Sequence, residues 1–478
     1  MLFNSINFAI FLPIVFTLYW FFTQNNLKLQ NLLLLISSYF FYACWDWRFL
    51  FLLMFSTFLD FFTGLKISQA KHLKSKNIWF WISISVNLGF LGVFKYYNFF
   101  AESFASALNN IGLHVNLWTI KVILPVGISF YTFHGLSYII DLYKNKIKAE
   151  KNLINYSVFV SFFPLLVAGP IERATHLLPQ IQKKRVFDYS KAVDGLRQIL
   201  WGLFKKVVIA DQCAEVANQV FNNYSDYSGS TLFLGIVFFT FQIYCDFSGY
   251  SDIALGTARL FGIDLIRNFA FPYFSRDIAE FWRRWHISLS SWFKDYLYIP
   301  LGGSKGGAWT KIRNTFIIFL VSGFWHGANW TFIIWGFVNA LFIMPSILFK
   351  TNRNNLEIVA KGNYLPNLKE LFSILTTFGL TMFAWIFFRA ESVEHAIRYV
   401  SGIFSISFFS LPSIRPYFIS LLLLLFITIE WIGRENNYAI SKLGLKWNPF
   451  VRYMFYYAII IAIFWFSGKE QEFIYFQF

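Results

Sequence analysis

Long apolar runs divide this chain into segments of membrane-spanning length. A helical span needs about 20 predominantly apolar residues, and about 11 stretches approach that length. They lie at 5–22, 28–46, 49–65, 78–95, 118–142, 154–170, 230–247, 314–349, 370–388, 416–433 and 451–467. The run at 314–349 is long enough for one tilted span with a re-entrant piece, or for two short spans. The pattern predicts an all-α polytopic membrane protein.

Composition agrees with a membrane setting. The 478 residues are 57% hydrophobic and 22% aromatic, and the mean hydropathy is +0.50, well above the usual balance of a soluble domain. No internal repeat is visible and no hydrophilic stretch is long enough to fold separately, so we expect one membrane domain over 1–478. The first run is not expected to be a cleaved signal peptide, because residues 1–7 carry no basic side chain.

Basic residues gather in short polar loops and predict the topology. The clusters are Lys66, Lys71, Lys74 and Lys76; Lys144, Lys146, Lys148 and Lys151; Lys183, Lys184 and Arg185; and Arg434, Lys442, Lys446 and Arg452. Such clusters favour the cytoplasm. The N-terminus is then extracytoplasmic, and so is the tail at 468–478. These loops account for the net charge of +16, so no nucleic-acid partner is expected.

Cysteine and histidine spacing gives no sign of a metal site. The three cysteines, Cys44, Cys213 and Cys245, are far apart, and the histidines show no paired spacing typical of metal ligands. We therefore expect neither a bound metal nor a disulfide scaffold.

His326 is the first candidate for chemistry because it stands alone in an apolar run. An ionisable side chain at membrane depth is costly and usually functional. The alternative is a packed histidine that bonds a carbonyl. Gly323 and Gly327 flank the ring, and we expect them to leave room for a substrate or a channel. Asn329 would share the ring's helical face, and could orient it, if this segment is helical.

His286 is the second candidate and lies in an aromatic, charged segment. Residues 277–298 have the spacing of an amphipathic interfacial helix. The charges of Arg283 and Arg284 are expected to disfavour protonation of His286, and a neutral imidazole is what a general base requires. The alternative is that this helix only anchors at the headgroups. The glycine-rich loop around Lys305 is interpreted as a flexible basic loop near an anionic donor. Together with Arg283, Arg284 and Lys294 it is expected to face the cytoplasm and attract that donor.

Two further polar stretches interrupt the apolar pattern. Polar residues at 246–252 directly follow the apolar run 230–244, and the simplest interpretation is a span end with Asp246 capping the next helix. Tyr131, Thr132 and His134 follow a proline and a glycine, which suggests a broken helix that lines a cavity.

Five segments together are specific to a known family. They are 124–133, 168–171, 244–252, 281–286 and 323–330. With them the chain resembles the membrane-bound O-acyltransferase family, and within it the bacterial branch that O-acetylates alginate. The resemblance implies a helical bundle with interfacial or re-entrant helices around a central cavity. It also implies acyl transfer from a cytoplasmic thioester, with His326 and His286 as the matching histidines. At 338–340 the chain lacks a further histidine-glycine pair that relatives often carry.

The aromatic tail at 473–478 is the last feature. On composition alone it is an anchor in the outer leaflet. The resemblance instead implies an acyl relay in which the phenol of Tyr475 is loaded before a periplasmic serine-hydrolase-like acetyltransferase takes the group. A phenol with a pKa near 10 is a better leaving group than an alkanol, so an acetyl-tyrosine would stay reactive toward such an enzyme.

The sequence therefore predicts an O-acyltransferase that exports acetyl groups across the inner membrane for O-acetylation of an extracellular or cell-wall polysaccharide. The expected partners are a cytoplasmic donor such as acetyl-CoA, a polysaccharide acceptor and membrane lipids, with no bound cofactor. Alginate-like and other exopolysaccharides are the leading acceptors. Peptidoglycan O-acetylation and D-alanyl export to teichoic acid are alternatives, and a non-catalytic transporter of polysaccharide or lipid intermediates is a more distant one.

Overall fold

Helices make up every regular element that the computed structural model describes, over residues 1–113, 119–120, 124–167, 169–468 and 471–474. This confirms the all-α prediction. The contacts group into two compact units. The first unit comprises Met1–Lys191 with Ala258–Ile266, and the second comprises Ala192–Thr257 with Arg267–Phe478. The expectation of a single domain over 1–478 stays a prediction.

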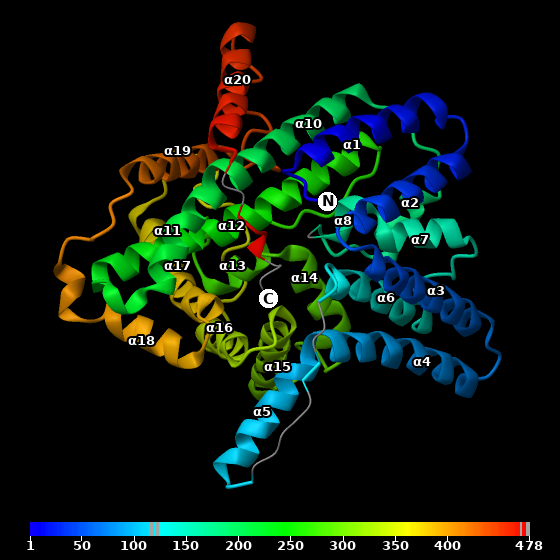
Figure 1. The fold of residues 1–478 in the computed structure, drawn as a ribbon, viewed down its shortest axis with the longest axis horizontal. Coiled ribbons are helices and arrows are strands. Elements are labelled where there is room, and N and C mark those ends of the chain that lie inside the picture. The colour runs from blue at the N-terminus through cyan, green and yellow to red at the C-terminus, as the bar shows by residue number, and fades with distance from the viewer. Residues whose placement is uncertain (114–118, 121–123, 168, 469–470, 475–478) are drawn as a thin grey trace. The chain divides into compact units, whose positions relative to one another are not determined.

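The first unit holds the N-terminal helices that Figure 1 draws in blue and cyan. They are α1 (Ile6–Thr17), the π-helical turn η1 (Leu18–Phe22), α2 (Leu27–Ala43), α3 (Trp47–Gln69), α4 (Leu73–Leu91), η2 (Gly92–Tyr96), α5 (Tyr97–Asn110), α6 (Ile128–Tyr143), α7 (Leu153–Ser161), α8 (Phe163–Leu166) and α9 (Ala174–Ile181). Helices α3, α4 and α6 pack against one another, and α7 packs on α2 and α3.

A buried carboxyl group lies at the centre of this packing. Asp60 of α3 accepts hydrogen bonds from the Ser83 hydroxyl at 2.6 Å and from the Asn87 amide at 2.8 Å, both on α4. On α6, a β-carbon at Gly135 would lie 2.0 Å from Oδ2 of Asp60. A glycine is therefore needed for α6 to approach α3 this closely, and the three helices meet around one polar group that is fully removed from lipid.

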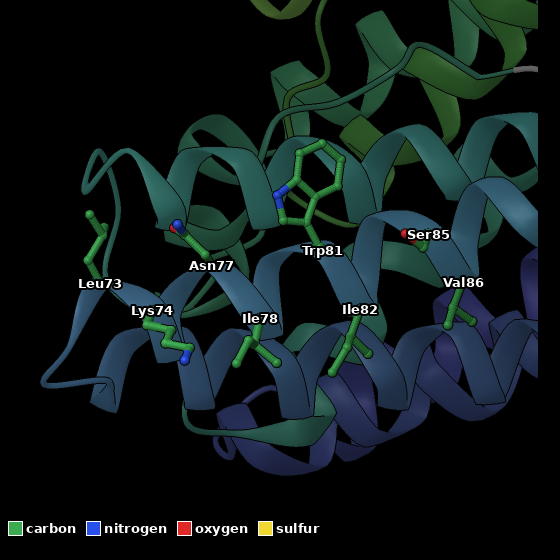
Figure 2. Close-up of a pocket in the computed structure, with 8 residues that line it drawn as sticks. All are labelled: Leu73, Lys74, Asn77, Ile78, Trp81, Ile82, Ser85 and Val86. Carbon is green, nitrogen blue, oxygen red and sulfur yellow. The ribbon is translucent and has the colours of Figure 1, made fainter.

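The outer face of α4 is apolar and open. Figure 2 shows eight side chains along a shallow groove on this helix. Leu73, Ile78 and Trp81 in this groove are all more than half exposed. An exposed apolar face of this kind suits contact with lipid tails.

The second unit holds the remaining helices. They are α10 (Tyr189–Leu203), whose first residues belong to the first unit, η3 (Phe204–Ala210), α11 (Asp211–Asn222), η4 (Tyr224–Asp226), α12 (Gly229–Leu260), whose last residues belong to the first unit, η5 (Pro272–Phe274), α13 (Ile278–Arg284), α14 (Ile287–Phe293), η6 (Lys294–Tyr298), α15 (Ala308–His326), α16 (Trp330–Leu348), α17 (Leu368–Arg389), α18 (Val393–Ile403), η7 (Ile406–Phe409), α19 (Tyr417–Gly433) and α20 (Pro449–Phe466).

The long apolar run at 314–349 folds as two helices, α15 and α16, that pack on each other. The glycines do not leave room for a substrate or a channel, which corrects that expectation. A β-carbon at Gly323 would lie 2.2 Å from the carbonyl oxygen of Phe332, and one at Gly327 would lie 2.1 Å from the Phe332 ring. The space beside each glycine is filled by α16, so both residues serve close helix packing.

Helix α12 continues through the polar stretch that looked like a span end. It runs without interruption from Gly229 to Leu260, so Asp246 lies inside the helix and does not cap the next one. Tyr131, Thr132 and His134 likewise lie within the buried α6 and not at a helix break. The predicted span at 154–170 is interrupted instead, because the helix ends at Ser161 and resumes at Phe163.

Six described helices are long and apolar enough to cross a membrane, and two shorter apolar helices accompany them. The six include α3, α12, α16, α17 and α20, together with the helical stretch from α4 through α5. The protein is therefore a multi-pass membrane protein. The total of about 11 membrane segments stays a prediction.

The close approach of α15 and α16 gives a testable expectation. The Gly323→Ala variant places a β-carbon against a backbone oxygen that cannot move aside cheaply, and should destabilise the fold by roughly 1–3 kcal/mol. The matched control is Gly379→Ala in α17, where a β-carbon meets nothing within 4 Å. Detergent-solubilised protein is heated, and the measurement is the temperature at which the monodisperse peak in size-exclusion chromatography is lost. Equal stability of the two variants would show that this packing is not tight.

Candidate active site

The predicted amphipathic helix at 277–298 is broken at His286. Helix α13 ends at Arg284, α14 begins at Ile287, and His286 between them has a left-handed backbone with φ 43°. Two hydrogen bonds to an extended segment satisfy the backbone at the break. Ala270 N–H donates to the Arg284 carbonyl at 2.9 Å, and Ile287 N–H donates to the Asn268 carbonyl at 2.9 Å. Positive φ is unusual for a residue with a β-carbon and marks a position that its surroundings enforce.

Asn268 also holds the His286 ring. Nδ1 of His286 lies 3.0 Å from Oδ1 of Asn268, and the Ser288 hydroxyl donates to the same oxygen at 3.0 Å. The amide nitrogen of Asn268 donates to the Ser251 hydroxyl at 3.2 Å. Because Oδ1 is an acceptor, Nδ1 carries the proton and Nε2 has the lone pair. Among the described residues Nε2 has no hydrogen-bond partner, so it is available to a substrate.

His286 is neutral, as expected, but for another reason. Burial lowers the pKa of His286 to about 3, and the ring is 1% exposed. Arg283 and Arg284 are not the cause. Arg283 donates to the carbonyls of Asn352 and Asn355 at 2.7 and 2.9 Å, and Arg284 forms an ion pair with Glu280 at 2.7 Å. The two arginines secure the loop after α16 and helix α13.

His326 is the last residue of α15 and is surrounded by aromatic rings. Its centroid lies 4.9 Å from Trp325, 5.1 Å from Trp335 and 5.2 Å from Phe388. The side chain is buried. Rings from α15, α16 and α17 thus enclose the imidazole and keep water away from it.

Trp325 connects the two histidines. Its indole lies 6.2 Å from the His286 ring and 4.9 Å from the His326 ring, both in edge-on arrangements. Residues 40 positions apart in the sequence therefore contact the same indole. The shared indole therefore brings the two imidazoles into one environment of aromatic rings that excludes water. A general base can act there while the donor is protected from hydrolysis.

The other candidates are not brought to the histidines. Asn329 does not share a helix with His326, because α15 ends before it. Its side chain caps α16 by accepting from Thr331 N–H at 3.0 Å and donates to the Glu391 carbonyl at 2.9 Å. Lys305 is exposed in the loop after η6, which Asn314 holds by donating to the Gly303 carbonyl at 3.1 Å.

Tyr475 lies outside the described residues, but the segment before it is described. Phe473 and Ile474 are buried. The Phe473 ring lies 4.3 Å from Tyr250 and 6.2 Å from Phe247, and Phe247 lies 4.7 Å from His286. Residues 473–474 therefore pack inside the second unit, and no lipid anchor is formed by these two residues.

Comparison with known proteins shows which family the chain is similar to. The sequence profile of the membrane-bound O-acyltransferase family matches residues 144–387, which include both histidines. A probable alginate O-acetylase of Pseudomonas putida is 36% identical, with all of both chains covered. The chain belongs to the membrane-bound O-acyltransferase family. It is therefore an acyltransferase.

Other relatives of this O-acyltransferase carry different names. A peptidoglycan O-acetyltransferase of Helicobacter pylori is 36% identical over 86% of this chain and 81% of the relative. A teichoic acid D-alanyltransferase of Bacillus subtilis is 28% identical over 56% of this chain and 70% of the relative. No group of three or more potential metal ligands occurs within the part of this acyltransferase that the structure describes.

A small polar cavity of the acyltransferase adjoins the His286 site and was not foreseen. Lys205, Asp252, Arg267, Asn268 and Glu430 are among its lining residues. Lys205 forms an ion pair with Asp252 at 2.6 Å, and Glu430 accepts from the Tyr244 hydroxyl at 2.7 Å. Glu430 could have been noticed as a lone acid in the run 416–433. Asn268 lies in no motif, and no sequence signal could have found it.

The contact between Asn268 and His286 generates a prediction on pH. In the Asn268→Asp variant a carboxylate faces Nδ1, which favours the imidazolium and should raise the pKa of His286 by about 1–3 units. If catalysis uses the neutral ring, the acid limb of the acyl-transfer profile should move to higher pH. The measurement is acyl transfer against pH in proteoliposomes.

The control for this shift is Ser288→Ala, which removes a hydroxyl donor to Asn268 but keeps the contact with His286. Its acid limb should stay in place. An Asn268→Asp profile that coincides with that of the unmodified protein would mean that His286 does not control the reaction.

Proposed function

We propose that this acyltransferase moves an acetyl group from a cytoplasmic thioester across the inner membrane for O-acetylation of an extracellular or cell-wall polysaccharide. The observation that carries the proposal is that His286 and His326 both contact Trp325, while Phe473, just before Tyr475, packs on Phe247, which contacts the His286 ring. The alginate and peptidoglycan relatives support a polysaccharide as the final acceptor.

The chemistry assigns a role to each histidine. His326 takes the proton of the acceptor hydroxyl while the oxygen attacks the thioester carbonyl. As the carbon–sulfur bond breaks, the leaving thiolate recovers that proton from the imidazolium. His286 offers Nε2 as a hydrogen-bond acceptor to a second N–H or O–H group of the bound substrates, because the single proton of the acceptor hydroxyl goes to His326. The aromatic rings around both imidazoles exclude water, which would otherwise hydrolyse the donor.

Tyr475 is the first acceptor in this proposal. Transfer of the acetyl group to its phenol gives an ester that is reactive enough to be taken by a periplasmic serine-hydrolase-like acetyltransferase. The burial of Phe473 and Ile474 supports this role, because an outer-leaflet anchor would leave them facing lipid. The positive-inside pattern supports extracytoplasmic N- and C-terminal segments.

The donor is acetyl-CoA or another acyl thioester that approaches from the cytoplasm. Lys305 and Lys294 are exposed and can attract an anionic donor. Arg283 and Arg284 instead donate to backbone carbonyls of the loop after α16 and act as structural supports. A second candidate function is O-acetylation of peptidoglycan, which the Helicobacter pylori relative favours.

Replacement of His326 tests the proposed base. General-base assistance contributes about 10²–10⁴-fold, so His326→Gln should lower acetyl transfer by about that factor at unchanged abundance in the membrane. The matched control is His395→Gln, because His395 is also buried but stacks on Tyr224 at 4.3 Å, away from Trp325. The measurement is polysaccharide acetyl content with an immunoblot of the membrane fraction. Normal acetylation in His326→Gln would remove this histidine from the mechanism.

Replacement of Tyr475 separates relay from anchor. The Tyr475→Phe variant keeps the ring and loses one oxygen, so a relay predicts loss of polysaccharide acetylation and an anchor predicts no change. The control is Tyr457→Phe, because Tyr457 is an exposed tyrosine on α20. With the downstream transferase absent, mass spectrometry of the tail peptide should find an acetyl adduct on Tyr475. Normal acetylation in Tyr475→Phe without any adduct would leave the tail with no relay role.

A further inference from the structure

A buried lysine links α12 to the last described residues. Lys206 lies in the π-helical turn η3 and is almost completely buried. Its Nζ atom lies 2.8 Å from Oδ1 of Asp246 and 2.8 Å from Oδ1 of Asp211, and it donates to the Gln471 carbonyl at 3.0 Å. Three oxygens surround the ammonium group, of which those of Asp211 and Gln471 accept hydrogen bonds and that of Asp246 forms an ion pair. One of them is a backbone oxygen of the tail.

Asp246 holds the tail at a second point. Its other oxygen, Oδ2, accepts a hydrogen bond from Ile474 N–H at 2.8 Å. The two members of the ion pair, Lys206 and Asp246, therefore bind one backbone carbonyl and one backbone N–H of residues 471–474. Phe473, between these two points, packs on Tyr250 and Phe247. Both hydrogen bonds join a backbone atom of the tail to a charged side chain. Such charge-assisted hydrogen bonds are stronger than neutral ones.

The neighbouring lysine provides an internal comparison. Lys205 also lies in η3 and also pairs with an acid of α12, at 2.6 Å from Asp252. It donates to the Ser248 hydroxyl at 2.9 Å instead of to the tail. The same two helical elements thus carry two buried ion pairs, of which the pair of Lys206 and Asp246 bonds to residues 471–474.

We propose that Lys206 and Asp246 form a backbone clamp that docks residues 471–474 and so positions the tail for acyl loading. Both are positioning residues and touch no reacting atom. The part about acyl loading rests on the proposed relay at Tyr475, whereas docking of the tail does not. By fixing Ile474, the clamp restrains the chain directly before the tyrosine that the relay requires.

The test measures amide exchange in the tail of the full-length protein in detergent. In Lys206→Met the ammonium is lost, and amide deuteration of the peptide that contains residues 471–474 should speed up on the order of tenfold, as expected for loss of a hydrogen bond to a charged group. Lys205→Met is the matched control and should leave the exchange of this peptide unchanged. Peptides from α15 and α16 report whether either variant has lost its fold.

A second variant keeps the test valid if removal of a buried charge partner unfolds the protein. Ile474→Pro deletes the N–H that Asp246 binds and leaves the cluster of Lys206, Asp246 and Asp211 complete. Its control is Ile474→Val, which keeps that N–H. Faster amide exchange at residues 471–473 in Ile474→Pro, but not in Ile474→Val, supports the clamp. Unchanged tail exchange in both Lys206→Met and Ile474→Pro would overturn it.

Acetylation of Tyr475 is the second readout. Lys206→Met should reduce it about tenfold, while acetyl transfer to a small phenol added in solution continues, because the histidines are intact. If the tail undocks but Tyr475 is never acetylated even in the unmodified protein, the relay fails and the docking role stands. If Tyr475 is acetylated normally while the tail is undocked, the positioning role is wrong and the relay stands.

Discussion

The hydrogen bond between His286 and Asn268 is the contact on which the rest of the site depends. An imidazole in an apolar interior is tolerated when it is neutral and when its protonated nitrogen has a partner. Asn268 meets the second condition at Nδ1 and thereby directs the lone pair of Nε2 away from itself. The backbone of the same residue accepts from Ile287 and stabilises the helix break that presents the ring. One asparagine thus fixes the position and the tautomer of His286.

Helix α12 joins this contact to the other parts of the second unit. Within less than two turns, Asp246 binds the tail, Phe247 packs on His286, Ser251 accepts from Asn268 and Asp252 pairs with Lys205. A span with this many polar groups is acceptable because Asp246, Ser248 and Ser251 are all buried inside the protein. Its polar residues face other protein groups and avoid the cost of contact with lipid. The tail and the histidine site are therefore organised by one helix.

The sequence predicted the features that depend on a local pattern of residues. It did not predict those that depend on contact with a residue far away in the chain. His326 stood out because it is a lone ionisable group in an apolar run, and the all-α fold followed from the long apolar runs. Gly323 and Gly327 were misinterpreted because only the structure reveals that α16 fills the space beside them.

Asp246 was assigned to a helix end because its partner, Lys206, is 40 positions away. The break at His286 was missed because its cause is backbone bonding to Asn268 and Ala270, which no periodicity records. Asn329 was judged as a helical neighbour of His326, although α15 ends at that histidine.

The central claim is that the acyl group reacts between His286 and His326, beside Trp325. The most direct measurement is a structure determined with a donor analogue in which a non-transferable thioether replaces the thioester. The account predicts that the acyl end of the analogue lies against Trp325, between the His286 and His326 rings. An acyl end bound elsewhere in the protein, with both imidazoles out of reach, would contradict it.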